Sequence, residues 1–147
     1  WEDEELKIRG STDDVVWVDV SGKVAGVEIK TINDNGFNQI VSTNTPKIEH
    51  LLQVNSYFLI GLCEIFYLLY ENKNDQNWKV FYLQPDLTII QRIKSRISSI
   101  IKLVDNNVLP EIIENKSICR DCSYLYMCYT SVIENGDAVQ EFETIKL

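Results

Sequence analysis

The chain has 147 residues, 45% of them hydrophobic, which suits one domain with a sizeable core. It contains no apolar run of about 18 residues, and its first residues are acidic, so we expect neither a membrane span nor a secretory leader. The formal net charge of −8 argues against tight, non-specific binding to duplex nucleic acid, because proteins that bind in this way usually present a basic surface.

A β-hairpin is predicted near the start of the chain, after an acidic lead-in at residues 2–9. Two runs rich in β-branched residues, 15–20 and 24–31, are joined through the turn dipeptide Ser21-Gly22. Residues that face each other across such a hairpin point to the same side of the sheet, and side chains alternate along each strand. The length of the turn therefore decides which side chains share a face.

Two acids and a lysine are predicted to share one face of this hairpin. A two-residue turn places Asp13 opposite Lys30, and Glu28 then lies on the same side. A four-residue loop keeps Asp13 on this face, whereas a three-residue loop brings Asp14 there instead. We expect Asp13.

This combination of side chains suits a metal-dependent nuclease. Mg²⁺ and Mn²⁺ prefer carboxylate and water oxygens, so Asp13 and Glu28 are candidate metal ligands. Lys30 could stabilise negative charge that develops on a phosphate, or orient a water molecule. The alternative is an exposed cross-strand pair of an acid and a lysine, worth about 0.2–1 kcal/mol.

A polar stretch and a helix follow the hairpin. Residues 33–45 are polar with one glycine, which predicts a loop. A helix is then predicted from Pro46, with Thr45 as its N-cap and Glu49 supporting the cap. One stripe of this helix should face the core: Ile48, Leu51, Leu52, Leu59 and Leu62. A second stripe carries polar groups: His50, Gln53 and Tyr57.

The second half of the core should consist of two strands and a long helix. Residues 64–71 predict a buried strand, 72–77 a turn and 78–83 a further strand, so that the whole forms a mixed α/β sandwich. The long helix should begin at residues 84–86 and reach about residue 106. Its apolar stripe is predicted to be buried: Leu87, Ile90, Ile93, Ile97, Ile100, Ile101 and Val104. Arg92 and Arg96 share an exposed face of this helix that either contacts a DNA backbone or is simply solvated.

Three short motifs, in this order, resemble those of the PD-(D/E)XK nuclease superfamily: Gly10-x-x-Asp13, Glu28-x-Lys30 and Gln53-x-x-x-Tyr57. The resemblance extends over roughly residues 6–128 and is closest to the RecB-like branch, which includes phage exonucleases and the iron–sulfur exonucleases of CRISPR adaptation. It implies an α/β fold, a restriction-endonuclease-like mixed sheet flanked by helices, with Mg²⁺ or Mn²⁺ as cofactor. The helix that usually begins this core is not in the sequence.

The resemblance also implies roles for individual residues. The backbone carbonyl of Ile29 would be a third metal ligand, Gln53 would organise Lys30 and the substrate, and Tyr57 would support Gln53. Lys73, in the turn after the buried strand, is a weaker candidate for substrate contact, with an ordinary exposed turn as its alternative. His50 either contacts phosphate or ends the polar stripe. No Gly-x-Ser-x-Gly motif accompanies it, which argues against a Ser-His-Asp hydrolase.

Three cysteines near the C-terminus have the spacing of a metal or cluster site. Cys119, Cys122 and Cys128 lie within ten residues of one another, and the first pair has chelate spacing. Thiolates in this arrangement hold either iron–sulfur clusters or zinc, and the spacing does not separate the two. The resemblance favours [4Fe–4S], with Zn²⁺ as the alternative. Cys63, at a helix end, is predicted to be a core residue.

The sequence as a whole predicts a metal-dependent DNA nuclease, most simply an exonuclease acting on DNA ends or single strands. Residues 1–110 would form the nuclease core and residues 111–147 a Cys-rich segment. Expected partners are DNA and proteins of a recombination or processing complex, in a bacterial cytoplasm or, for a phage protein, the host cytoplasm. The alternative is a non-catalytic nucleic-acid-binding or structural domain that keeps the nuclease fold.

Overall fold

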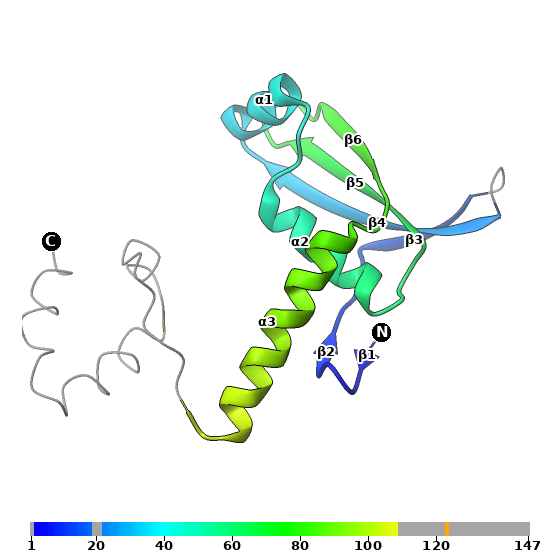
Figure 1. The fold of residues 1–147 in the computed structure, drawn as a ribbon. Helices are drawn as coiled ribbons and strands as arrows, with labels where there is room; N and C mark the ends of the chain where they lie inside the picture. The colour runs from blue at the N-terminus through cyan, green and yellow to red at the C-terminus, as the bar shows by residue number, and fades with distance from the viewer. Residues whose placement is uncertain (1, 19–21, 109–122, 124–147) are drawn as a thin grey trace, which may run out of the picture. The chain divides into compact units, whose positions relative to one another are not determined.

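The computed structural model describes residues 2–18, 22–108 and 123, which form a mixed α/β fold (Figure 1). This confirms the fold class predicted from the sequence. The helices and strands, in chain order, are β1 (Glu2–Asp3), β2 (Ile8–Arg9), β3 (Asp14–Val18), β4 (Lys23–Ile32), α1 (Asp34–Thr43), α2 (Ile48–Leu59), β5 (Ile65–Asn72), β6 (Trp78–Leu83) and α3 (Leu87–Asp105).

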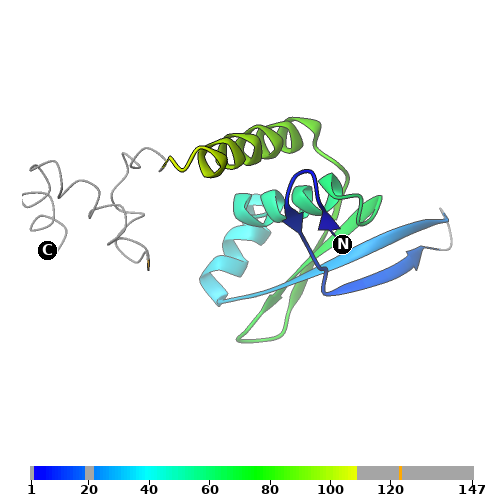
Figure 2. The same cartoon turned by 90° about the horizontal axis from the view of Figure 1, so that it is seen from below.

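A four-stranded sheet in the order β3-β4-β5-β6 is the centre of the fold, and β1 and β2 form a separate small hairpin. The pairs β3–β4 and β5–β6 are antiparallel, whereas β4 and β5 are parallel. Figure 2 shows β4 as a long strand beside β3. Parallel neighbours need a crossover connection, and here α1 and α2 together supply it.

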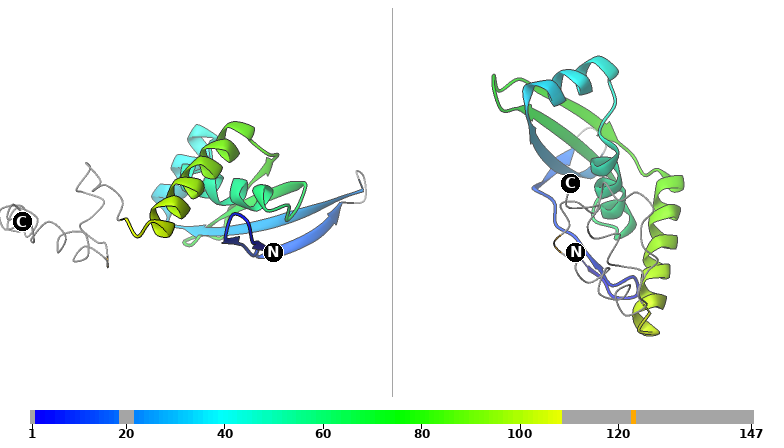
Figure 3. Two further views of the ribbon diagram at one scale, coloured as in Figure 1. Left: turned by 60° about the horizontal axis from the view of Figure 1, so that its bottom comes forward. Right: turned by 90° about the vertical axis from the view of Figure 1, so that its left-hand side faces the viewer.

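Both crossover helices pack on one face of the sheet (Figure 3, left). Apolar residues at helical spacing meet the even-numbered side chains of β5, which all point to that face. The two buried clusters are Phe37, Ile40, Leu68 and Tyr70, and Val54, Tyr57, Leu62 and Phe66. The opposite face keeps large side chains in contact with solvent; Trp78, for example, is 68% exposed.

The predicted hairpin is present, but its register differs from the expected one. Strand β3 ends at Val18 and β4 begins at Lys23, so that four residues connect them rather than two. Asp14 consequently pairs with Val27. Because the loop is longer by an even number of residues, the two faces of the hairpin are unchanged, and Asp13 stays on the side of Glu28.

The prediction of a loop at residues 33–45 was wrong, because α1 occupies most of this stretch. The side chain of Asn33 caps the helix by accepting a hydrogen bond from the backbone N–H of Gly36 at 2.9 Å. Phe37 and Ile40, three residues apart, are both buried and hold the helix to the sheet. Asn44 ends it with a left-handed backbone, φ 47°. Two well-spaced apolar residues and a cap therefore outweigh the polar composition.

Helix α2 begins later than predicted and buries a different face. Its N-cap is Lys47, which makes no capping hydrogen bond through its side chain, so Thr45 is not the cap. Leu62, just after the helix, is buried as predicted. Ile48 is 60% exposed, however, and Leu52 is also exposed, so the predicted core stripe was wrong at these two positions. The sheet lies on the side of Tyr57 instead, because that side carries Val54 as well.

The remaining predicted elements are present, although α3 is not buried as expected. Strands β5 and β6 follow the predicted ranges within one residue. Asp86 caps α3 by accepting hydrogen bonds from the backbone N–H groups of Thr88 and Ile89. None of the helix residues is buried in the described structure, and Val104 is 64% exposed. Helical periodicity indicates which side chains form a stripe, but it does not show what covers them.

Two compact units divide the chain, Trp1–Lys102 and Leu103–Leu147. The four-stranded sheet and the residues discussed below as a site belong to the first unit. A membrane-crossing helix is not found among the described residues, since none of their helices is both long and apolar enough.

Candidate active site

Strand β4 contributes an ion pair to the site. Glu28 and Lys30 are two residues apart, so both side chains point to the face that the helices cover. The Nζ atom of Lys30 lies 2.5 Å from the Oε1 atom of Glu28. Glu28 is only 3% exposed, and the side chain of Lys30 is also largely buried. A buried carboxylate needs such a partner, because burial without one strongly disfavours the charged form.

Asp13 joins these residues from the segment before β3. Its Oδ2 atom accepts a hydrogen bond from the backbone N–H of Ile29 at 2.7 Å. Thr12, which the sequence did not single out, fixes this segment through a hydrogen bond of 2.5 Å from its hydroxyl to the carbonyl of Val27. The structure therefore brings Asp13 to the edge of β4 next to Glu28, as predicted, with Asp14 on the other side.

Helix α2 completes the polar cluster with two side chains, one helical turn apart. Gln53 donates through Nε2 to the Oε1 of Glu28 at 2.9 Å and to the hydroxyl oxygen of Tyr57 at 2.6 Å. The pKa of Tyr57 is raised, first by burial and further by the negative charges of Glu28 and Asp13, while the hydrogen bond from Gln53 lowers it. Tyr57 is therefore a neutral phenol at physiological pH.

Gly10 has a packing role that explains its place in the first motif. A Cβ atom at this position would lie 3.1 Å from the ring of Tyr57 and 3.0 Å from the Cδ1 of Ile60. The ring of Tyr57 is itself stacked on Phe66, with centroids 5.4 Å apart. The close approach of Gly10 thus lets the chain pass directly beside α2 and carry Asp13 into the site.

The carboxylates of Asp13 and Glu28 are oxygen groups of the kind that a small, hard cation prefers. The hydrogen bonds from Lys30 and Gln53 end on the Oε1 atom of Glu28, and the bond from the backbone N–H of Ile29 ends on the Oδ2 atom of Asp13. Tyr57 also makes a side-chain hydrogen bond with the carboxylate of Glu28. The carbonyl of Ile29 points to the same edge of β4 as its N–H, beyond the point where pairing with β3 begins. Two carboxylates and a carbonyl suit Mg²⁺, which usually keeps several waters.

Groups of three or more His, Cys, Asp or Glu side chains that could hold a metal ion do not occur in the described part of the chain. The proposed site has only two such side chains, those of Asp13 and Glu28, with a backbone carbonyl as the third oxygen ligand, so it has fewer members than a group of this kind. The binding of Mg²⁺ or Mn²⁺ at this site therefore stays a prediction.

His50 lies in the same polar stripe of α2 but is held by a different partner. Its Nδ1 atom is 2.7 Å from the hydroxyl oxygen of Tyr70, and the backbone N–H of Lys47 donates to that oxygen at 3.1 Å. The pKa of His50 is lowered, first by burial and then by the positive charge of Lys30. Nothing in the sequence pattern pointed to Tyr70, since it lies in a strand that is apolar over most of its length.

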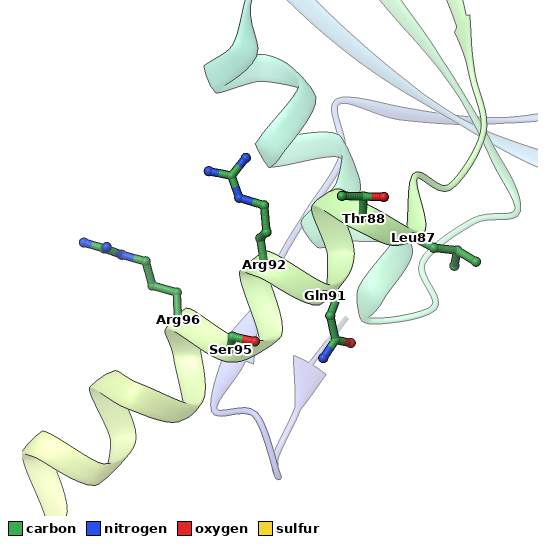
Figure 4. Close-up of a pocket in the computed structure, with 6 residues that line it drawn as sticks. All are labelled: Leu87, Thr88, Gln91, Arg92, Ser95 and Arg96. Atoms are coloured by element: carbon green, nitrogen blue, oxygen red, sulfur yellow. The ribbon is translucent and has the colours of Figure 1, made fainter.

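The structure does not bring the other predicted substrate contacts into this cluster. Lys73 donates its backbone N–H to the carbonyl of Ile32 at 2.9 Å, which places it in the turn at the end of β4 and β5, and its side chain is exposed. Arg92 and Arg96 line an open hollow along α3 and lie on the same side of the helix (Figure 4). Their role in binding a DNA backbone stays a prediction.

The predicted metal or cluster ligands Cys119, Cys122 and Cys128 lie outside the described residues. Cys63 carries a free thiol, is partly buried and packs against the second core cluster, as predicted. Burial raises the pKa of this thiol, so it is protonated at physiological pH and is not a reactive thiolate.

Comparison with known proteins shows a likeness of fold only. No protein-family model matches the chain, and no curated protein matches it. A solved structure described as "Crystal structure of SSO0001" is similar over 80% of this chain, with a TM-score of 0.52 and 20% sequence identity. The matched part covers 48% of that protein, so this chain spans about half of its length.

Proposed function

We propose that this chain carries the active site of a metal-dependent nuclease that hydrolyses phosphodiester bonds in DNA. The observation that supports this most strongly is the cluster in which the buried carboxylate of Glu28 holds Lys30, with Asp13 bonded to the neighbouring backbone N–H of Ile29. These are the groups needed to bind a divalent cation and to meet the negative charge of a phosphate. We further propose that it acts as an exonuclease, in recombination, repair or other DNA processing.

The protein residues divide the work between metal binding and charge stabilisation. Asp13, Glu28 and the carbonyl of Ile29 would hold Mg²⁺ or Mn²⁺, and such an ion would supply Lewis-acid activation of water and of the phosphate. Lys30 would place its ammonium group against the phosphate oxygens, where negative charge increases in the transition state.

Gln53 gives the site its rigidity. By donating to the Oε1 of Glu28, it holds the carboxylate of strand β4 to helix α2. Its second contact, from the same Nε2 atom to the hydroxyl oxygen of Tyr57, also fixes the orientation of the amide. A constellation held in this way needs little rearrangement when a substrate binds.

The experiment that tests the proposal is cleavage by the purified full-length protein. Single-stranded and duplex oligonucleotides labelled at either end should be shortened with Mg²⁺ or Mn²⁺, and EDTA should stop the reaction. A circular DNA without ends should persist if the enzyme is an exonuclease. Lys30→Ala should lower the rate by about 10²-fold, the usual effect of losing one electrostatic stabiliser.

Lys73→Ala is the matched control for Lys30→Ala, because it removes an exposed lysine that makes no side-chain contact with the cluster in the described structure. Its rate should stay within about twofold of wild type. Equal rates for wild type and Lys30→Ala would show that the cleavage comes from another protein in the sample. Binding of oligonucleotides without any cleavage would instead favour a non-catalytic nucleic-acid-binding domain.

A further inference from the structure

The ring of His50 contacts the hydroxyl group of a buried tyrosine, Tyr70. Tyr70 has 0% of its surface exposed, and its hydroxyl oxygen lies 2.7 Å from the Nδ1 atom of His50. The two rings are tilted against each other, with centroids 5.4 Å apart. A phenol that is sealed inside the core must satisfy its polar atoms with protein groups, since water does not reach it.

The bonds to this hydroxyl fix the tautomer of His50. The oxygen of Tyr70 accepts a hydrogen bond from the backbone N–H of Lys47 at 3.1 Å. In the described structure the hydroxyl has no third partner, so its own proton can be satisfied only by the Nδ1 of His50. A neutral imidazole that accepts at Nδ1 carries its proton at Nε2. His50 therefore presents an N–H donor on the side of the ring away from Tyr70.

Burial, together with the charges around the pair, keeps both groups neutral. The pKa of His50 is lowered by burial first, then by Lys30, while Glu49 raises it and Lys47 lowers it slightly further. The pKa of Tyr70 is raised by burial and by the charge of Glu49, and the hydrogen bond from Lys47 lowers it. The imidazole and the phenol thus share one hydrogen bond between uncharged partners near pH 7.

The position of Tyr70 places His50 next to the proposed site. Tyr70 pairs with Lys30 across the parallel strands, so the two side chains stand side by side on the face covered by α2. His50 precedes Gln53 by three residues, which puts both on one stripe of that helix. The effect of Lys30 on the pKa of His50 reflects this closeness.

We propose that His50 binds the substrate of this site by donating Nε2–H to a non-bridging oxygen of a phosphodiester next to Lys30, with Tyr70 as its positioning residue. The inference rests on the proposed nuclease function and adds a specific role to it. A neutral N–H donor suits this place, because a second cation beside Lys30 would be repelled, whereas a neutral imidazole still polarises an anionic oxygen.

The tautomer and the contact can be read by NMR, because the chain contains one histidine. In full-length protein with ¹⁵N-labelled histidine, Nε2 should carry the proton in wild type, and Tyr70→Phe should give a mixture of tautomers. A short single-stranded oligodeoxynucleotide, added with Ca²⁺ in place of Mg²⁺, should shift the Nε2 resonance. An Nε2 signal that does not move at saturating oligonucleotide would overturn the proposed contact.

Cleavage rates test the same contact independently. His50→Phe removes the donor and should lower kcat/KM by about ten- to a hundredfold, the scale of one hydrogen bond to a charged group. His50→Gln keeps an N–H donor and should recover part of the loss. Ser56→Ala, on the same helix, is the control, because among the described residues its hydroxyl hydrogen-bonds only to the backbone carbonyl of Leu52, within the helix. Wild-type kcat/KM in His50→Phe would overturn the proposal.

The two measurements separate this inference from the nuclease proposal. A protein that cuts no DNA, but whose Nε2 resonance shifts with oligonucleotide, loses the proposed nuclease activity and keeps the contact at His50. A protein that depends on Lys30 for cleavage, but whose Nε2 resonance stays fixed, keeps the activity and loses the contact.

Discussion

Gln53 places its side-chain nitrogen 2.9 Å from the Oε1 atom of Glu28, and these residues are 25 positions apart in the chain. This bond joins helix α2 to strand β4. The buried carboxylate thus receives one donor from its own strand, Lys30, and one from the helix above it. The geometry of the proposed site consequently depends on how well α2 is packed against the sheet.

Replacing Gln53 with leucine should destabilise the fold and weaken activity. The change removes a hydrogen-bond donor from a carboxylate that has almost no contact with water, and the penalty for such a loss is about 1–3 kcal/mol. Urea denaturation should show this decrease in the free energy of unfolding. Gln39→Leu, at an exposed position of α1, is the matched control. Equal stability of the two variants would contradict the structural role of Gln53.

Replacing Gly10 with alanine should disturb the site through Tyr57. The added methyl group would be pressed against the ring of Tyr57, which cannot retreat easily because it is stacked on Phe66. Overpacking of this kind costs about 1–3 kcal/mol. We expect a lower melting temperature and slower DNA cleavage, whereas Ser11→Ala, at an exposed neighbour, should change neither. A Gly10→Ala protein with the stability of wild type would show that the ring adjusts freely.

Acidification should destabilise the protein through His50. Its pKa in the folded state lies below the ordinary value of 6.5, so the unfolded chain binds more protons as the pH falls below 6.5. The free energy of unfolding therefore falls from pH 6.5 down through the folded pKa. Wild type should lose more stability than His50→Gln between about pH 7.5 and pH 5, as urea denaturation would measure. Equal losses would mean that His50 titrates normally.

The cysteines make a separate prediction about metal content. Full-length protein purified without oxygen should contain iron, with the broad visible absorbance of iron–sulfur thiolate ligation, or zinc without colour. Cys122→Ser should lower this content, whereas Cys63→Ser should not, because Cys63 is a protonated core thiol. If neither metal is found and Cys119, Cys122 and Cys128 are all freely alkylated, the three cysteines do not form a metal or cluster site.

The parts of the site that could be predicted depend on local periodicity. The alternation of side chains in a strand placed Glu28 and Lys30 together, and helical spacing placed Gln53 with Tyr57. Both placements are independent of the length of the hairpin loop and of the residue at which helix α2 begins. The predicted pairing of Asp13 with Lys30 did not survive, because the true length of the turn was not evident from Ser21-Gly22.

Features that depend on tertiary packing could not be predicted in the same way. Helix α1 was missed because its polar residues conceal two buried positions, Phe37 and Ile40. On α2, the most apolar stripe was assigned to the core, yet Ile48 remains in solvent. The link between His50 and Tyr70 joins residues 20 positions apart, and no spacing rule relates them. Such contacts are decided by the sheet that forms beneath the helices.

The parallel pairing of β4 with β5 has a kinetic consequence. The pairing of Tyr70 with Lys30 closes a long loop, because helices α1 and α2 lie between the two strands in the chain. Contacts between residues far apart in sequence form slowly during folding. An early hairpin of β3 and β4 would hold Asp13 near Glu28 but would lack Gln53 and His50. Cleavage activity should therefore return late in refolding, after most of the secondary structure has formed. The rate at which activity returns would then report the rate at which β5 pairs with β4.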